Sequence, residues 1–253
     1  MKYLAKIKYL GTNFCGFQVQ PNARTVQGEL TRAMSELFGA PCKITGCSRT
    51  DSGVHANEHV TVIDAPGATV PPERLPLAAS RFLPDDISLF YAIKCDDTFH
   101  PRYDVVSKEY LYVIKNQSVK DPFWVGRAWF ISRPIDEKSL TLMRSAAKHF
   151  IGKHDFAAFM SEGSDVSDTV RTVFDLRIEK DGDTLRVRIS ADGFLYNMVR
   201  IIVGTLVEVA NGRIKSDSIP DIIYSRDRSR AGITSPPDGL YLNRVNYRLP
   251  DFQ

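Results

Sequence analysis

The stretch Gly46-Cys47-Ser48-Arg49-Thr50-Asp51-Ser52-Gly53-Val54-His55-Ala56 lies between two predicted β-strands, residues 43–46 and 59–64. It gathers an arginine, an aspartate and a histidine around Gly53, and glycine permits the backbone angles that a sharp turn needs. A loop held between rigid strands is a usual place for chemistry. Asp51 is therefore the first candidate catalytic residue. An ordinary solvated turn with a local Arg–Asp pair is the alternative.

Outward from this loop, the first half of the chain alternates strands and helices. Residues 3–10 and 87–93 have the composition of strands, and a helical apolar pattern runs from an N-cap at Thr25 to a terminating Gly39. A second helix is expected to begin at Pro71, because proline is tolerated in the first turn. The resulting order, β-α-β-β-α-β, is that of a ferredoxin-like unit.

The second half repeats this order without repeating the sequence. The predicted strands cover 108–115, 124–131, 173–179, 184–190 and 240–247, and the predicted helices cover 136–151 and 195–210. We therefore expect an α+β fold of two ferredoxin-like βαββαβ units, with mixed, mostly antiparallel sheets and helices on one side. The predicted domains are 1–102, carrying the Asp51 loop, and 103–253, completing an active-site cleft.

Composition limits the class of protein. The 253 residues are 43% hydrophobic and 25% charged, which is typical of a globular protein with a core. No apolar run approaches the roughly 18 residues of a membrane span, and residues 1–8 alternate instead of forming a signal-peptide block. We therefore expect a cytoplasmic protein with no membrane contact. The four cysteines form no CxxC pair, which argues against a structural zinc site.

The charge balance is weakly basic. A net charge of +3 and a pI of about 8.6 are compatible with a polyanionic partner. Because the chain has no basic tail, nucleic-acid binding would require charges that the fold gathers into a groove.

One motif suggests a different chemistry. Residues 55–59, His-Ala-Asn-Glu-His, fit the H-x-x-E-H pattern of inverted zinc peptidases. The pattern requires a helix, whereas these residues run into the strand-like 60–63. On a strand, residues four apart are separated by about 13 Å, too far to chelate one ion. We therefore expect no metal here.

Two further residues are candidates for a site. Arg200 lies in an otherwise apolar helix, where a buried charge needs a partner such as Asp51. The alternative is an arginine on an exposed stripe. Tyr110 and Tyr112 share one face of a predicted strand beside Lys108, an arrangement suited to stacking on a nucleic-acid base. The alternative is that both tyrosines belong to the core.

Several motifs in the expected order resemble the tRNA pseudouridine synthase A family along nearly the whole chain. The family's loop G-R-T-D-A-G-V-H-A is matched by residues 48–56, its opening Y-D-G-T-x-F-x-G-W-Q-x-Q by 9–20, and T-V-Q-G-x-L by 25–30. Its strand tyrosine is matched by Tyr110, F-L-x-x-M-V-R by 194–200, and A-P-x-x-G-L-x-L by 235–242. The departures are Ser48 for glycine, Ser52 for alanine, Phe17 for tryptophan, Leu10 for aspartate and Ser235 for alanine.

The resemblance implies the pseudouridine synthase fold and an isomerase acting on tRNA. Uridines 38, 39 and 40 of the anticodon stem-loop would become pseudouridine, with no cofactor or metal. A stacked uridine must first be flipped out, at a cost of a few kcal/mol. Family members are homodimers whose joint surface forms a basic groove for tRNA.

The resemblance also implies roles for single residues. Asp51 would be the nucleophile, attacking either C6 of the base or C1′ of the sugar. Arg49 would fill the place of the flipped base, and Tyr110 would stack on the uracil and assist proton transfer. Arg200 would pair with Asp51 and keep it anionic, and His55 would contribute to substrate binding. A non-catalytic ferredoxin-like RNA-binding protein is the main alternative, and it would need no Asp51 nucleophile.

Overall fold

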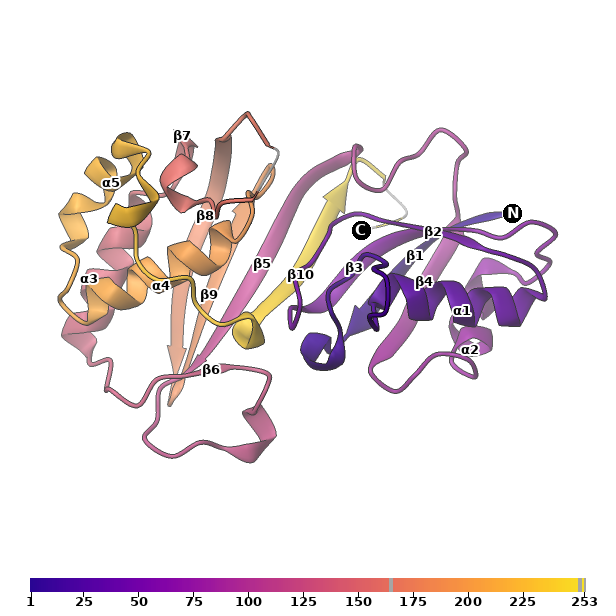
Figure 1. Cartoon of the computed structure of the whole chain (residues 1–253), viewed down its shortest axis with the longest axis horizontal. Coiled ribbons are helices and arrows are strands. Elements are labelled where there is room, and N and C mark those ends of the chain that lie inside the picture. The colour runs from indigo at the N-terminus through magenta and orange to yellow at the C-terminus, as the bar shows by residue number, and fades with distance from the viewer. Residues whose placement is uncertain (164–165, 250–251, 253) are drawn as a thin grey trace. The chain divides into compact units, whose positions relative to one another are not determined.

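The chain divides into two units in a computed structural model that describes residues 1–163, 166–249 and 252 (Figure 1). Unit 1 comprises Met1–Val106 and Tyr241–Gln253, and unit 2 comprises Ser107–Leu240. The predicted boundary after residue 102 is close to this division. Residues 241–253, which the prediction assigned to the second domain, group with unit 1. That the units are independent domains stays a prediction.

Unit 1 has the predicted ferredoxin-like order. Its elements are β1 (Lys2–Tyr9), α1 (Val26–Phe38), β2 (Lys43–Gly46), β3 (His55–Asp64), α2 (Leu75–Ala79), β4 (Ile87–Lys94) and, from Tyr241 on, β10 (Leu240–Tyr247). The sheet order is β4-β1-β3-β2, with antiparallel pairs throughout. β10 pairs in parallel with the start of β3, where Tyr241 lies opposite His55.

The first helix of unit 1 forms as its sequence predicts. The Thr25 hydroxyl accepts a hydrogen bond from the Gly28 amide at 3.2 Å, which satisfies one of the amides left unpaired at a helix start. Gly39 ends α1 in the left-handed conformation, with φ of 64°. Leu30 and Met34 are fully buried, so the apolar face of the helix packs against the sheet.

Unit 2 is also built from antiparallel strands and helices. Its elements are β5 (Val105–Lys115, from Ser107 on), β6 (Trp129–Phe130), α3 (Glu137–Lys148), β7 (Gly152–Asp155), β8 (Val170–Asp181), β9 (Thr184–Ala191), α4 (Met198–Ala210) and α5 (Ile219–Ser225). The sheet order is β5-β9-β8-β7, and β6 adds a short parallel pair to the end of β5. α3 contacts both α4 and β8. The α+β class and the mostly antiparallel pairing are therefore confirmed.

Several predicted boundaries in unit 2 were wrong. The strand expected over 124–131 shrinks to β6, because Pro122–Trp124 form a short 3₁₀ turn. β7 and α5 were not predicted, since a four-residue strand and a seven-residue helix give little periodicity. α4 begins at Met198, after Asn197 adopts a left-handed conformation.

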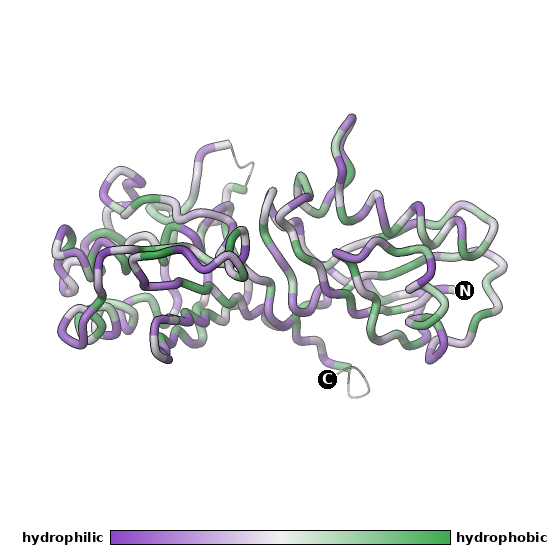
Figure 2. The backbone as a smooth tube through the Cα atoms, turned by 90° about the horizontal axis from the view of Figure 1, so that it is seen from below, coloured by the Kyte–Doolittle hydropathy of each residue, from purple (hydrophilic) through white to green (hydrophobic). Residues whose placement is uncertain are grey.

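The hydrophobic residues come in short stretches along both units, separated by hydrophilic ones (Figure 2). The largest fully buried side chains include Tyr3 and Leu30 in unit 1 and Tyr112 and Phe156 in unit 2. Among the described residues, no helix combines the length and apolar character needed to cross a bilayer. Each unit thus buries large side chains of its own.

Candidate active site

The loop that carries Asp51 connects β2 to β3 and closes in a tight turn. The Val54 amide donates to the Asp51 carbonyl oxygen at 3.1 Å, and Gly53 between them has φ of 80°. This is the position at which a type II turn requires positive φ, so the predicted role of Gly53 is confirmed. Gly46 has no positive φ. It is needed for space, because a Cβ there would lie 2.4 Å from the Phe17 ring.

A preceding segment, residues 9–17, holds the loop through hydrogen bonds. The Phe17 amide donates to the Thr50 carbonyl oxygen at 3.0 Å, and the Gly53 amide donates to the Phe14 carbonyl oxygen at 3.3 Å. The Tyr9 hydroxyl is bonded to the Thr50 hydroxyl at 2.8 Å, and both residues are buried. The backbone on both sides of Asp51 is therefore tied to this segment.

Two glycines of the same segment allow this close approach. Gly16 has φ of 91°, and a Cβ there would lie 2.7 Å from the Thr50 carbonyl oxygen. At Gly11 a Cβ would lie 2.0 Å from the Val54 carbonyl oxygen. Real Cβ contacts are never this short, so any larger residue must displace the loop. Neither glycine was predicted to have a structural role, although both stand in the motif of residues 9–20.

The side chains of the loop point to different environments. Thr50 is buried, whereas Arg49 is exposed and Asp51 is partly exposed. Because the backbone is fixed at Thr50, the carboxylate is presented by a rigid support. An exposed guanidinium beside it is able to reach a polyanion.

The two histidines of β3 contact the Asp51 loop and the segment 9–17 that holds it. His55 is fully buried, its Nδ1 accepts a hydrogen bond from the Gly11 amide at 2.9 Å, and its ring stacks on Tyr241 at 4.5 Å. His59 Nε2 is bonded to the Ser48 carbonyl oxygen at 3.0 Å, and its ring stacks on Phe17 at 4.1 Å. Both lie on β3, which begins at His55, four residues before the predicted start of the strand at residue 59. The predicted contact of His55 with substrate stays a prediction.

Potential metal ligands do not gather in the part of the chain that the structure describes. No group of three or more histidine, cysteine, aspartate or glutamate side chains there has the geometry to hold an ion. His55 and His59 instead make separate contacts with Gly11 and Ser48.

In unit 2 the two tyrosines of β5 differ in their surroundings. Tyr110 is 8% exposed, and its ring meets Phe194 edge to face at 5.0 Å. Tyr112 is fully buried, and its hydroxyl donates to the Pro236 carbonyl oxygen at 2.7 Å. Burial raises the pKa of the Tyr112 phenol well above its usual range, so it stays a protonated donor. The core interpretation therefore fits Tyr112.

Arg200 lies in the first turn of α4 and is oriented by two acceptors. Its Nε donates to the Ser235 carbonyl oxygen and its Nη1 to the Asn197 side-chain oxygen, both at 2.7 Å. Asn197 has φ of 60° and also donates to the Ser161 hydroxyl at 3.0 Å. These contacts do not fit an arginine on an exposed stripe. The start of a thirteen-residue helix adds a positive partial charge, so this end of α4 favours an anion.

Residues 235–239 contact β5 and α4, the two elements of unit 2 that carry these residues. The carbonyl oxygens of Ser235 and Pro236 accept the hydrogen bonds from Arg200 and Tyr112 described above. Gly239 packs against β5, where a Cβ would lie 2.6 Å from the Val113 carbonyl oxygen. Unit 1 thus holds Arg49, Asp51 and His55, and unit 2 holds Tyr110 and Arg200.

Comparison with known proteins gives consistent matches. Residues 5–104 and 146–248 match the model of a family described as tRNA pseudouridine synthase. The chain is 46% identical over 241 residues to a protein of Thermoanaerobacter sp. strain X514 named tRNA pseudouridine synthase A, covering 95% of this chain and 97% of that one. Its identity to the proteins of the same name from Bacillus subtilis and Staphylococcus aureus is 43% over 249 residues and 39% over 256 residues. These two alignments cover 98% and 100% of this chain, and 99% and 96% of the relatives.

Proposed function

This chain belongs to the tRNA pseudouridine synthase family, and we propose that it isomerises uridines 38, 39 and 40 of the anticodon stem-loop with Asp51 as the nucleophile. That the protein is an isomerase forming pseudouridine in tRNA follows from the family. The tRNA positions and the residue roles are our proposal.

The observation that carries the proposal is the support of the Asp51 loop. The backbone is bonded to residues 9–17 on both sides of Asp51, and two glycines have no room for a side chain. A purely solvated turn needs no such support. A carboxylate held in one place is what covalent catalysis requires, because misplacement by about 1 Å costs on the order of 10²-fold in rate.

The proposed reaction rearranges bonds within one nucleotide. The carboxylate of Asp51 attacks C6 of the uracil or C1′ of the ribose, and the bond between N1 and C1′ breaks. The uracil turns and C5 forms a bond to C1′, while the bond from the Asp51 oxygen to C6 or C1′ breaks and frees the carboxylate. The proton of C5 is lost and N1 gains one. Atoms and electrons balance without an oxidant, a reductant or a metal.

Arg49 is proposed to keep the target uridine out of its stack. A base within a helical stem is unreachable until it is flipped, which costs a few kcal/mol. Arg49 precedes the nucleophile by two residues and is exposed. Its planar guanidinium suits the place that the base leaves, since it stacks on neighbouring bases and pairs with phosphates.

Tyr110 and Arg200 are proposed to complete the chemistry from unit 2. The ring of Tyr110 stacks on the flipped uracil, and its hydroxyl assists the proton transfer at C5. Arg200 pairs with the carboxylate of Asp51 and favours its charged form. The two hydrogen bonds that orient the guanidinium support this role, as does the positive end of α4.

The remaining assignments concern His55 and the assembly. We propose that His55 serves substrate binding through the loop that it braces, since its ring is fully buried. We also propose a cytoplasmic homodimer whose combined basic surface binds tRNA. The net charge of +3 per chain is compatible with such a surface.

The test is the mapping of pseudouridine in unmodified tRNA after incubation with wild type and Asp51→Asn. Wild type should modify uridines 38, 39 and 40. Asp51→Asn should lose on the order of 10⁴-fold or more in rate while tRNA affinity stays within several-fold, because an amide is no nucleophile. Asp85→Asn, which changes an exposed carboxylate outside the loop, is the matched control.

Three outcomes would contradict parts of the proposal. Substantial turnover by Asp51→Asn would remove it as nucleophile. Pseudouridine at other positions would overturn the assigned sites. A wild-type protein that binds tRNA and makes no pseudouridine would favour the non-catalytic RNA-binding alternative.

A further inference from the structure

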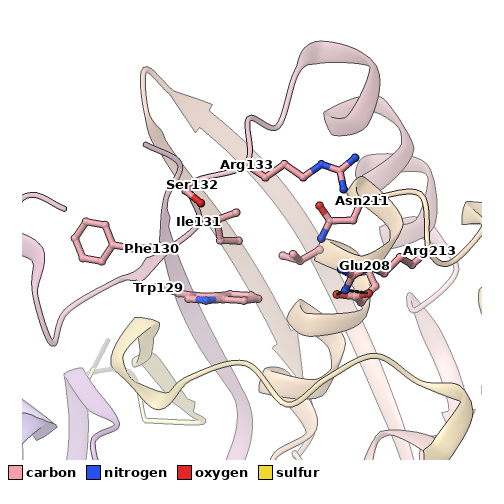
Figure 3. Close-up of a pocket in the computed structure, with 9 residues that line it drawn as sticks. Trp129, Phe130, Ile131, Ser132, Arg133, Glu208, Asn211 and Arg213 are labelled. Atoms are coloured by element: carbon pink, nitrogen blue, oxygen red, sulfur yellow. Dashed lines mark hydrogen bonds and ion pairs between the residues drawn. The ribbon is translucent and has the colours of Figure 1, made fainter. Parts of the chain in front are cut away.

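Unit 2 contains a pocket of about 290 Å³ at the C-terminal end of α4 (Figure 3). One wall comes from β6 and the residues after it, and the other from the end of the helix; the residues used below are Trp129, Arg133, Glu208, Asn211 and Arg213. Arg200 lies in the first turn of the same helix. Eleven residues at 1.5 Å each separate it from Asn211 by about 16 Å along the axis. The pocket is therefore distinct from the end of α4 that carries Arg200.

Trp129 gives the pocket a flat aromatic wall. Its indole is partly exposed and is held from behind by Tyr112, whose ring meets it edge to face at 6.2 Å. Figure 3 shows the indole lying across the pocket, with Arg133 and Asn211 on one side of its plane. A planar ligand that enters between the indole and these two side chains would stack on the indole.

The polar groups of the pocket fall into two kinds. Glu208 is paired with Arg213, whose Nη1 lies 3.0 and 3.2 Å from the two carboxylate oxygens. The side-chain amide of Asn211 and the guanidinium of Arg133, by contrast, make no hydrogen bond to any other described residue. One neutral donor–acceptor pair and one cation thus remain for a ligand.

These groups match the parts of a nucleotide. Aromatic side chains bind unstacked bases by stacking, whatever the base. An asparagine amide presents a donor and an acceptor side by side, as the edge of a base does. A guanidinium binds phosphate. The pocket lies at the lower end of the roughly 300–1,000 Å³ range of ligand pockets, a size suited to a single nucleotide.

Charge determines how the nucleotide would lie. The lining carries two arginines against one glutamate, a net charge of +1. The carbonyl groups at the end of α4 carry a negative partial charge, which repels phosphate from Asn211. The phosphate therefore belongs at the Arg133 guanidinium, since Arg213 is paired with Glu208, and the base lies between Trp129 and Asn211.

We infer that this pocket binds one unstacked nucleotide of the tRNA substrate, in addition to the uridine that is isomerised. The inference rests on the proposed function to the extent that tRNA is the bound polymer. The same chemistry would also accept a free nucleotide, and the experiment separates the two sources.

The experiment measures the affinity of the full chain for unmodified tRNA over a series of salt concentrations. Arg133→Gln should weaken binding about three- to tenfold and lower the log–log salt slope by about 0.7 to 0.9, the contribution of one phosphate. Asn211→Ala should weaken binding several-fold and leave the slope unchanged. Arg177→Gln, which removes a charge from an exposed side chain of β8, is the control and should alter neither quantity.

A second measurement tests Trp129, whose replacement by alanine would leave Tyr112 uncovered. In a Trp124→Phe background, the fluorescence of Trp129 should be quenched when tRNA binds, because a stacked base quenches an indole. Trp129→Phe keeps a ring for stacking and should retain most of the affinity.

Unchanged tRNA affinity in both Arg133→Gln and Asn211→Ala would overturn the inference. If AMP alone quenches Trp129 while the tRNA affinities stay unchanged, the pocket takes a free nucleotide instead. These readouts do not depend on turnover. Failure of the pocket would therefore leave pseudouridine formation by wild type intact, whereas failure of the proposed function would appear in the mapping experiment.

Discussion

The Asp51 loop of unit 1 and the β5–α4 elements of unit 2 hold their polar side chains in different ways. The loop has no regular structure around Asp51 and is fixed by backbone hydrogen bonds to residues 9–17. Tyr110 and Arg200 lie on a strand and a helix, and side-chain contacts with Phe194, Asn197 and Ser235 set their orientation.

This difference explains which part of the site can be predicted from the sequence. A backbone held against another backbone demands glycine at fixed positions, so the loop and its support produce a recognisable pattern. A side chain on a regular element is oriented by packing, which uses the same residue types as any core. Tyr110 and Tyr112 therefore look alike in the sequence, although only Tyr112 is fully buried.

Among the variants that test this comparison between the loop and the β5–α4 elements, the largest effect on the rate is expected at Tyr110. Tyr110→Phe keeps the ring and its packing on Phe194 but removes the hydroxyl. If the hydroxyl transfers a proton, the single-turnover rate should fall about 10²-fold or more, the usual size of a general acid–base contribution. A rate within threefold of wild type in a protein with unchanged thermal stability would limit Tyr110 to stacking.

The next largest effect on the rate is expected from a change in the segment that supports the Asp51 loop. Gly16→Ala places a Cβ 2.7 Å from the Thr50 carbonyl oxygen, so the backbone beside Asp51 must shift. We expect the single-turnover rate to fall about 10²-fold, because nucleophile and substrate are misaligned.

The control for Gly16→Ala is Gly67→Ala. Gly67 also has positive φ, at 70°, but a Cβ there has nothing within 4 Å. Gly67→Ala should therefore share the backbone strain without the contact, and its rate should be that of wild type. Equal rate losses in the two variants would show that strain, not displacement of the loop, is responsible.

The smallest effect on rate is expected at Tyr112. Tyr112→Phe leaves the carbonyl oxygen of the partly buried Pro236 without its 2.7 Å hydrogen bond. The free energy of unfolding, measured with urea, should fall by about 1–3 kcal/mol, and the rate should change less than threefold. Tyr103→Phe, at a tyrosine that is 75% exposed, should leave the free energy of unfolding unchanged. A large rate loss in Tyr112→Phe would contradict the assignment of Tyr110 to the reaction and of Tyr112 to the core.

Most regular elements could be predicted because their physical signals are local. α1 has a capping threonine, an apolar face and a terminal glycine within fifteen residues, and its bounds follow from them. The hairpin of β8 and β9 turns at Gly182, which has φ of 57°. The pairing of β10 with β3 was missed, since partners almost 190 residues apart leave no local signal.

The site was predictable in its residue types and less so in its support. Asp51 and Arg49 stand out because charged residues flank a turn glycine. Asn197 does not stand out in the sequence, because its role depends on its left-handed backbone conformation before α4. That conformation brings its side chain to Arg200. The Trp129 pocket has no sequence signal, since its walls come from segments about 80 residues apart.

The most direct test of the account is tritium release from tRNA that carries tritium at C5 of uridine. Each pseudouridine formed replaces the bond between C5 and hydrogen with a bond between C5 and C1′, so one tritium enters water. We expect wild type to release tritium at the same rate with and without a chelator, and Asp51→Asn to bind the tRNA but release none above background. Release by Asp51→Asn near the wild-type rate, or loss of wild-type release on chelation, would contradict a metal-free reaction with Asp51 as nucleophile.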